Sequence, residues 1–277
     1  MHSRYAHMPA DEIVRRFASG LLALRLQHIA LAVVLGAGGI LAVNRLNLAL
    51  YLVCLAAIIL SFIAFLVRLG RAFAGLQDIL WQDGDIRTYR AVLEALRLRW
   101  RRASSVNALE LELAFCDYFD CRDDDALERL GRLSFSGRKN AQRLRVFNLC
   151  ALIYHDRGDV ARRDEVVAQI RRMAAAYRAG SKIERAASGL ARELALRFEP
   201  PEQWGDDDAR YLRGQLASAD KNINRWGLRL NLAAYGMAHG DAARAREELE
   251  ALGVEPLVPR YERMRSELLL HMGTEKI

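Results

Sequence analysis

Residues Leu48 to Val67 read LALYLVCLAAIILSFIAFLV, a run of 20 positions without a charged side chain. At about 1.5 Å per residue, a helix of this length spans the roughly 30 Å hydrocarbon core of a bilayer. A buried core helix of a soluble protein is usually shorter and is interrupted by polar residues. The run therefore predicts a membrane-spanning helix.

A weaker apolar segment precedes it, from Leu21 to Val43, and contains Arg25 near one end, where a long cation can reach the headgroups. A cleaved signal peptide is the rival interpretation. It fits poorly because the apolar run begins late and a second span follows. The four residues Asn44-Arg45-Leu46-Asn47 can only turn the chain back, so the two spans are predicted to form an antiparallel hairpin over residues 21–69.

Arginine residues flank the hairpin on one side. Those near its two ends are Arg15, Arg16, Arg25, Arg68, Arg71, Arg87 and Arg90, whereas the connecting loop has Arg45 alone. Positively charged flanks stay in the cytosol. We therefore expect a cytosolic N-terminal segment over residues 1–20, both termini inside, and a location in the cytoplasmic (inner) membrane. Cys116, Cys121 and Cys150 show no disulfide-like spacing, as expected of reduced thiols.

The rest of the chain has a different composition. The whole chain has 41 Lys and Arg residues, of which only six lie in residues 1–70, and 34 Asp and Glu residues, of which only two lie there. Residues 71–277 are therefore densely charged, with almost equal numbers of cations and acids. It is rich in Ala, Leu, Arg and Glu, and the whole chain has five Pro. This composition favours helices and predicts an all-α protein without a sheet. Its Arg and Ala content is typical of a bacterial protein.

A turn motif recurs after helical stretches, at Gln82-Asp83-Gly84-Asp85, Asp120-Cys121-Arg122-Asp123, Asp156-Arg157-Gly158-Asp159 and Ala238-His239-Gly240-Asp241. Gly84 to Cys121 and Cys121 to Gly158 are both 37 positions, and Gly158 to Gly240 is 82, close to two such units. The missing turn is expected near Glu199-Pro200-Pro201-Glu202. Glycine permits the left-handed conformation that ends one helix, and aspartate caps the next.

The positions around these turns repeat as two amphipathic helices per unit. Leu232-Ala233-x-x-Gly236, then Gly240-Asp241, then Ala245-x-x-x-Leu249, resembles the tetratricopeptide superfamily of helical-hairpin repeats, and Cys150-Ala151-x-x-Tyr154 with Gly158-Asp159 is the next best match. Arg163 replaces the usual small residue, Cys121 replaces the turn glycine, and no unit has the closing proline. The resemblance covers roughly residues 70–255. It implies an α-solenoid of about five hairpins over residues 70–277, with a capping helix from Leu257 to Met272. An irregular helical bundle is the alternative.

Such arrays present a concave groove to protein partners. The resemblance implies that the first helix of each unit lines this groove, with Phe115, Tyr118, Phe119, Arg145, Asn148, His155 and Asn231. The other interpretation is that the aromatic side chains fill the interior between repeats. The predicted function is a membrane-anchored scaffold or adaptor, as in envelope or export assemblies. Homo-oligomerisation is left open.

Motifs of catalysis are absent from the sequence: there is no HExxH, paired CxxC, P-loop, GxSxG or dinucleotide fingerprint. Asp123-Asp124-Asp125 and Asp206-Asp207-Asp208 each precede a helix, where acids favour the helix dipole. We therefore expect no catalytic residue, no cofactor and no metal site. An enzyme with a nonstandard site is kept as an alternative.

Basic clusters occur at Arg97-x-Arg99-Trp100-Arg101-Arg102 and at Arg138-Lys139. A membrane-tethered nucleic-acid-binding protein is a second alternative, but acids interleave elsewhere and a solvated or lipid-facing surface is favoured. One helix is predicted from about Leu48 to about Gln82, and a second returns toward the membrane after Gly84. Arg68, Arg71, Arg99, Trp100, Arg101 and Arg102 are therefore predicted to lie at the membrane interface.

Overall fold

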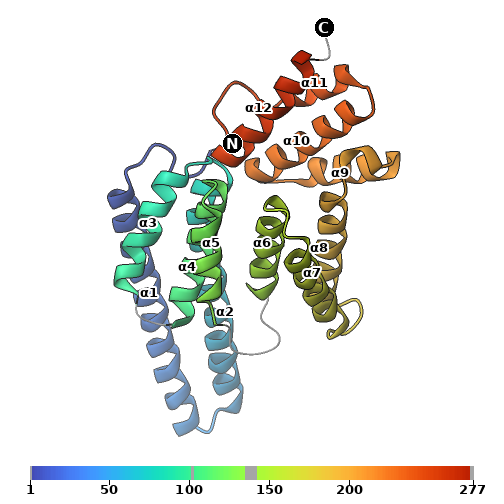
Figure 1. Cartoon of the computed structure of the whole chain (residues 1–277). Helices are drawn as coiled ribbons and strands as arrows, with labels where there is room; N and C mark the ends of the chain where they lie inside the picture. Colours follow the sequence, from blue (N-terminus) through green and yellow to red (C-terminus); the bar gives the residue numbers. More distant parts are fainter. Residues whose placement is uncertain (1, 101–102, 135–141, 275–277) are drawn as a thin grey trace. The chain divides into compact units, whose positions relative to one another are not determined.

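The computed structural model describes residues 2–100, 103–134 and 142–274. In these ranges the chain forms twelve α-helices and one short 3-10 helix, and it contains no strand (Figure 1). The prediction of an all-α protein is confirmed. The chain divides into two compact units, Met1–Asp83 and Gly84–Ile277. Each unit is described on its own.

The first unit is a hairpin of two long helices, α1 (Ala10–Asn44) and α2 (Leu48–Trp81), which run side by side (Figure 1). Asn47 begins α2, because its side chain accepts a hydrogen bond from the Leu50 N–H at 3.0 Å. The predicted turn and the predicted unbroken second helix are confirmed. The first helix starts earlier than the predicted span, because Pro9 precedes Ala10 and acids fill the first turn.

The apolar side chains of this hairpin are largely exposed. Of the 27 exposed large hydrophobic side chains in the described residues, 22 lie between Leu22 and Val67. In the most apolar windows of α1 and α2, only 11% and 6% of the residues are buried. The core helix of a soluble protein would be mostly buried. Both helices are therefore long and apolar enough to cross a membrane, and they differ from a core helix in their exposure.

Contacts between the two helices are made by small, aromatic and polar residues. A Cβ placed on Gly38 would lie 3.4 Å from the Cys54 Sγ, so the backbones approach closely there. At the other end of the hairpin, the rings of Phe17 and Phe73 pack edge to face at 5.3 Å. Between these levels, the His28 Nδ1 and the Ser61 Oγ lie 3.1 Å apart. These contacts run along the hairpin and fix its antiparallel register.

The second unit contains the remaining helices: α3 (Ile86–Arg99), α4 (Ala103–Phe119), α5 (Asp123–Gly131), α6 (Gln142–Asp156), α7 (Val160–Ala175), α8 (Lys182–Phe198), η1 (Pro201–Gln203), α9 (Asp206–Ser218), α10 (Asn222–Ala238), α11 (Ala242–Glu250) and α12 (Pro259–Thr274). Three consecutive pairs, α4 with α5, α6 with α7 and α10 with α11, pack as antiparallel hairpins (Figure 1).

The aligned turns share one backbone conformation. The residues in the repeated position have positive φ angles of 69°, 59°, 70° and 73°, at Gly84, Cys121, Gly158 and Gly240. Three of these turns end in an aspartate whose carboxylate accepts a hydrogen bond from a backbone N–H of the next helix, at Asp85, Asp159 and Asp241. The predicted Gly-Asp turns are therefore confirmed, and Cys121 adopts the glycine conformation.

Two features differ from a regular array of hairpins. Helix α8 ends at Phe198 as expected, and α9 packs mainly against α10, although its Tyr211 ring lies 4.6 Å from the guanidinium of Arg192 on α8. The predicted C-terminal helix is present as α12, and it contacts α4 as well as α10. Repeats in a solenoid contact only their neighbours. The structure thus shows helical hairpins, with a C-terminal helix that reaches across the unit.

Candidate functional site

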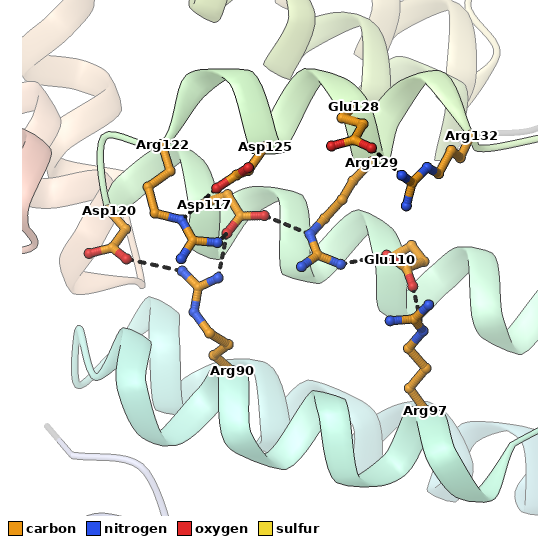
Figure 2. A network of polar contacts seen from close by, with 10 residues as sticks. All are labelled: Arg90, Arg97, Glu110, Asp117, Asp120, Arg122, Asp125, Glu128, Arg129 and Arg132. Carbon is orange, nitrogen blue, oxygen red and sulfur yellow. Dashed lines mark hydrogen bonds and ion pairs between the residues drawn. The ribbon is translucent and has the colours of Figure 1, made fainter.

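A network of charged side chains joins α3, α4 and α5 (Figure 2). At its centre the Asp117 side chain is fully buried and forms ion pairs with Arg90, Arg122 and Arg129, the last two at 2.7 and 2.6 Å. Arg129 also binds Glu110 at 2.8 Å. Because every buried charge has a charged partner, the network can hold the three helices together without leaving a free charge to bind a ligand.

Arg145, which was predicted to clamp a partner, has an internal partner. Its guanidinium binds the Glu112 carboxylate at 2.6 Å and lies over the Phe115 ring at 4.9 Å. The Tyr89 hydroxyl donates to the same carboxylate at 3.2 Å, and burial together with the Glu112 charge raises the pKa of Tyr89. Arg145 therefore stabilises the contact between α4 and α6.

The three predicted groove aromatics are buried. Phe115, Tyr118 and Phe119 are only 5%, 2% and 3% exposed. The Phe119 ring packs edge to face on Tyr261 of α12, with centroids 5.7 Å apart. Their assignment to an open groove is therefore wrong, and the interior interpretation fits. The physical reason is that α12 covers this face of α4, a contact between segments far apart in the sequence.

One arginine of α12, Arg260, contacts several groups on this face of α4. The Arg260 Nε donates to the Tyr118 carbonyl oxygen at 2.7 Å, and its guanidinium lies 3.9 Å from the centre of the Tyr118 ring. The same guanidinium forms ion pairs with Asp123 and Asp156. A single buried side chain thus joins α12 to the end of α4, the start of α5 and the end of α6.

A cavity of about 430 Å³ lies in the second unit, with walls from α6, α8, α9, α10 and α12. Two predicted groove residues, Asn148 and Asn231, are brought together in its wall from helices far apart in sequence. The cavity has an apolar floor, formed by Leu196, Leu212 and Trp204, which are buried. Its remaining wall is mainly polar, with the amides Asn148, Gln215, Asn224 and Asn231.

A cation also lines this cavity. Arg197 of α8 is half-buried, and Tyr261 of α12 lines the same cavity. Burial alone would lower the pKa of Arg197, but the phenols of Tyr118 and Tyr261 and the carboxylates of Asp156 and Glu193 raise it overall. Arg197 is therefore charged, in keeping with guanidinium chemistry. The volume of the cavity is within the usual range of ligand sites.

His155 lies apart from the cavity wall. Its ring stacks on Phe198 with centroids 4.6 Å apart, and it is half-buried. Burial lowers the pKa of His155, and the nearby Arg163 and Arg197 lower it further, against the opposing charge of Asp156. His155 therefore packs between α6 and α8 as a neutral ring.

The predicted membrane-interface residues come from both units. Arg68 and Arg71 are exposed on α2, and Arg99 is exposed at the end of α3. Trp100 follows Arg99 and is half-buried, while Leu98 is 86% exposed. Arg101 and Arg102 lie outside the described residues. Their role at a membrane stays a prediction.

Sequence reasoning missed much of the cavity wall, namely Glu193, Arg197, Trp204, Tyr211 and Tyr261. Trp204 had a usable signal, because a large aromatic that follows two prolines in a turn often packs inward. Arg197 had none, because it is one of many arginines on a charged helix. In the described ranges, no group of His, Cys, Asp and Glu is assembled that could hold a metal ion.

Comparisons of the chain with protein-family models, with curated proteins and with solved structures gave no match.

Proposed function

We propose that this protein is a membrane-anchored adaptor. The N-terminal hairpin is inserted in the cytoplasmic membrane as two spans, with both termini in the cytosol. The second unit is a tetratricopeptide-like repeat domain that holds a segment of a protein partner, in an envelope or export assembly of a bacterium. The role is one of binding rather than catalysis.

Exposure and charge support the membrane part of the proposal. Apolar side chains cover the outside of α1 and α2, where water would disfavour them and lipid would not. The loop between the helices has Arg45 alone, while Arg15, Arg16 and Arg25 lie toward the start of α1 and Arg68 and Arg71 toward the end of α2. In this arrangement Arg68 and Arg71 of α2 contact lipid headgroups, and a membrane-facing role of Arg99 and Trp100 is part of the proposal.

The cavity supports the binding part, and one observation carries it. Four amide side chains line the cavity, those of Asn148, Gln215, Asn224 and Asn231, and none of them has a hydrogen-bond partner within the described residues. A carboxamide offers a donor and an acceptor, which match the C=O and N–H of a peptide group. Four such groups in one concave wall suit an extended segment of another protein.

Site-specific photocrosslinking in native membranes tests the proposal. A photoreactive residue replaces Asn224, which is exposed at the cavity, and in a matched control it replaces Arg263, which is exposed on α12 outside the cavity wall. We expect an adduct of one defined mass from position 224 only. That mass also tells whether the partner is a second copy of this chain.

The double variant Asn148→Ala, Asn231→Ala provides the second arm. It should lower the adduct yield at least about five-fold, since each lost hydrogen bond costs about 1 kcal/mol, without changing the melting temperature of the protein. Equal adducts from positions 224 and 263, or a yield that the double variant leaves unchanged, would contradict a partner site in this cavity.

A further inference from the structure

The charge of Arg197 lacks a close counter-ion. Arg90, Arg129, Arg145 and Arg260 each bind a carboxylate directly. Within the described ranges, the guanidinium of Arg197 forms no ion pair. A guanidinium has five N–H donors, and because Arg197 lines the cavity these donors can serve a ligand there.

The nearest acids either bind other cations or form no ion pair with Arg197, and two of them, Glu193 and Asp220, line the same cavity. Asp156 is bound by Arg260 and lies 3.4 Å from the Tyr118 hydroxyl, which donates to it. Glu193 precedes Arg197 by one turn on α8, yet it is exposed and forms no ion pair with it. Asp220 lies 3.7 Å from the Lys221 amine. Within the described residues, Arg197 thus has no directly bound carboxylate.

The surroundings of Arg197 strengthen its attraction for an anion. The apolar floor of Leu196, Trp204 and Leu212 excludes water from that side of the cavity, and a charge interaction is stronger where water is excluded. A planar guanidinium binds a carboxylate through two parallel hydrogen bonds. Asn148 and Asn231 in the same wall can bind the atoms next to that carboxylate.

We propose that Arg197 recognises a carboxylate side chain on an acidic peptide segment of the partner, while Asn148 and Asn231 hold the adjoining peptide groups. This inference rests on the proposed function and adds the chemistry of the partner to it. The cavity favours an acidic segment because a carboxylate supplies a direct counter-ion for Arg197. A neutral segment of the same shape leaves that cation desolvated.

A matched pair of peptides tests the proposal on the full-length protein in detergent. The probes are acetyl-Ala-Ala-Glu-Ala-Ala-amide and the same peptide with Gln in place of Glu, measured by calorimetric titration at constant ionic strength. We expect the Glu peptide to bind at least about ten-fold more tightly, as charge-assisted hydrogen bonds are about twice as strong as neutral ones. Equal binding of the two peptides, or binding of neither, would overturn the proposal.

Two further arms identify the source of the carboxylate. Succinate and inorganic phosphate are titrated under the same conditions. If either binds as tightly as the Glu peptide, the cavity is a small-anion site and the assignment to a peptide is wrong. Weak binding of both, beside tight binding of the Glu peptide, supports the amide contacts as well as the charge contact.

Variants locate the effect. Arg197→Gln should remove the preference for Glu over Gln. Asn231→Asp is nearly isosteric and places a carboxylate in the same cavity, so it should also remove the preference while raising the melting temperature. The Asn231→Asp variant keeps the proposal testable if Arg197→Gln does not fold. If Asn231→Asp still prefers the Glu peptide to the Gln peptide, the proposed site is wrong. If the unmodified protein does not prefer the Glu peptide but still forms the adduct from position 224, this inference is refuted and the proposed function stands.

Discussion

Cys121 has the backbone conformation of a glycine. Its φ angle of 59° is close to those of Gly84, Gly158 and Gly240 at the equivalent turns. In that conformation the Cβ of an L residue crowds the following carbonyl oxygen, at a cost of roughly 1–2 kcal/mol. The turn forms nevertheless, because the backbone N–H of Arg122 donates a 2.8 Å hydrogen bond to the Asp117 carbonyl oxygen and so closes it. The helical hairpin therefore holds one strained residue.

The strain at this turn can be relieved. Cys121→Gly should raise the free energy of unfolding by about 0.5–1 kcal/mol, because the loss of strain exceeds the extra entropy of glycine in the unfolded chain. Gly158→Ala is the matched reverse change, since open space surrounds Gly158 and only its φ of 70° matters. It should lower that free energy by about 1 kcal/mol. Urea unfolding measures both, and a destabilised Cys121→Gly variant would show that the thiol contributes packing instead.

At the scale of elements, ion pairs decide which helices touch. Asp117 lies on α4. Its three partners are Arg90 on α3, Arg129 on α5 and Arg122, which directly precedes α5 (Figure 2). A buried ion pair contributes little to stability compared with apolar packing, but breaking it leaves a charge without a partner. The network therefore fixes the mutual arrangement of these helices more than it raises their stability.

Removal of the central carboxylate tests this account. Asp117→Asn leaves Arg90 and Arg129 without their buried partner and should lower the free energy of unfolding by roughly 2–4 kcal/mol. Glu128→Gln breaks the exposed pair with Arg132 and should change it by less than about 0.5 kcal/mol. Chemical unfolding of both variants provides the comparison. Similar values for the two variants would mean that the network is dispensable.

Helix α12 makes a second prediction at this scale. Arg260→Gln removes the cation that binds Asp123 and Asp156. We expect residues 259–274 to exchange their amide hydrogens faster, by an order of magnitude or more. Arg263→Gln, on the exposed side of the same helix, should leave exchange unchanged. Hydrogen exchange followed by mass spectrometry resolves this segment. Unchanged protection in Arg260→Gln would show that apolar contacts such as Tyr261 with Phe119 hold α12 alone.

For the whole molecule, the distribution of exposed apolar side chains separates the two units. The first unit presents them along most of α1 and α2, while the second has only Leu98, Val160, Val254, Leu269 and Leu270 exposed to a comparable degree in its described residues. The proposed membrane insertion of the first unit would remove this apolar surface from water.

Cysteine labelling can determine the topology. In a Cys121→Gly background, Leu46→Cys places a thiol in the loop, where the side chain is 94% exposed, and Val254→Cys places one at a position 99% exposed in the second unit. An impermeant maleimide added to intact spheroplasts should label position 46 and not position 254, and lysis should expose position 254. Burial raises the pKa of the native Cys150 thiol to about 11, so it reacts slowly. The reverse labelling pattern would place the second unit outside the cytosol.

The sequence by itself determined the local features of this protein. The 20-residue uncharged run, the four-residue loop and the Gly-Asp turns each act within a few residues of the chain, so their patterns can be read directly. The two long helices and the turns at Gly84, Cys121, Gly158 and Gly240 were therefore predictable. Asn148 and Asn231, which line the cavity, were also among the predicted groove residues, because the resemblance to tetratricopeptide repeats implies that the first helix of each unit lines the groove.

Only the tertiary structure decided which of these faces stay open. The contact of Arg260 with the Tyr118 carbonyl oxygen joins residues 142 positions apart. It buries the aromatic face of α4 that the repeat pattern assigned to a partner. Arg145 is likewise bound by Glu112 and unavailable to a ligand, while Arg197 is left facing the cavity. Such choices depend on the packing of distant helices, and packing between distant segments leaves no period in the sequence.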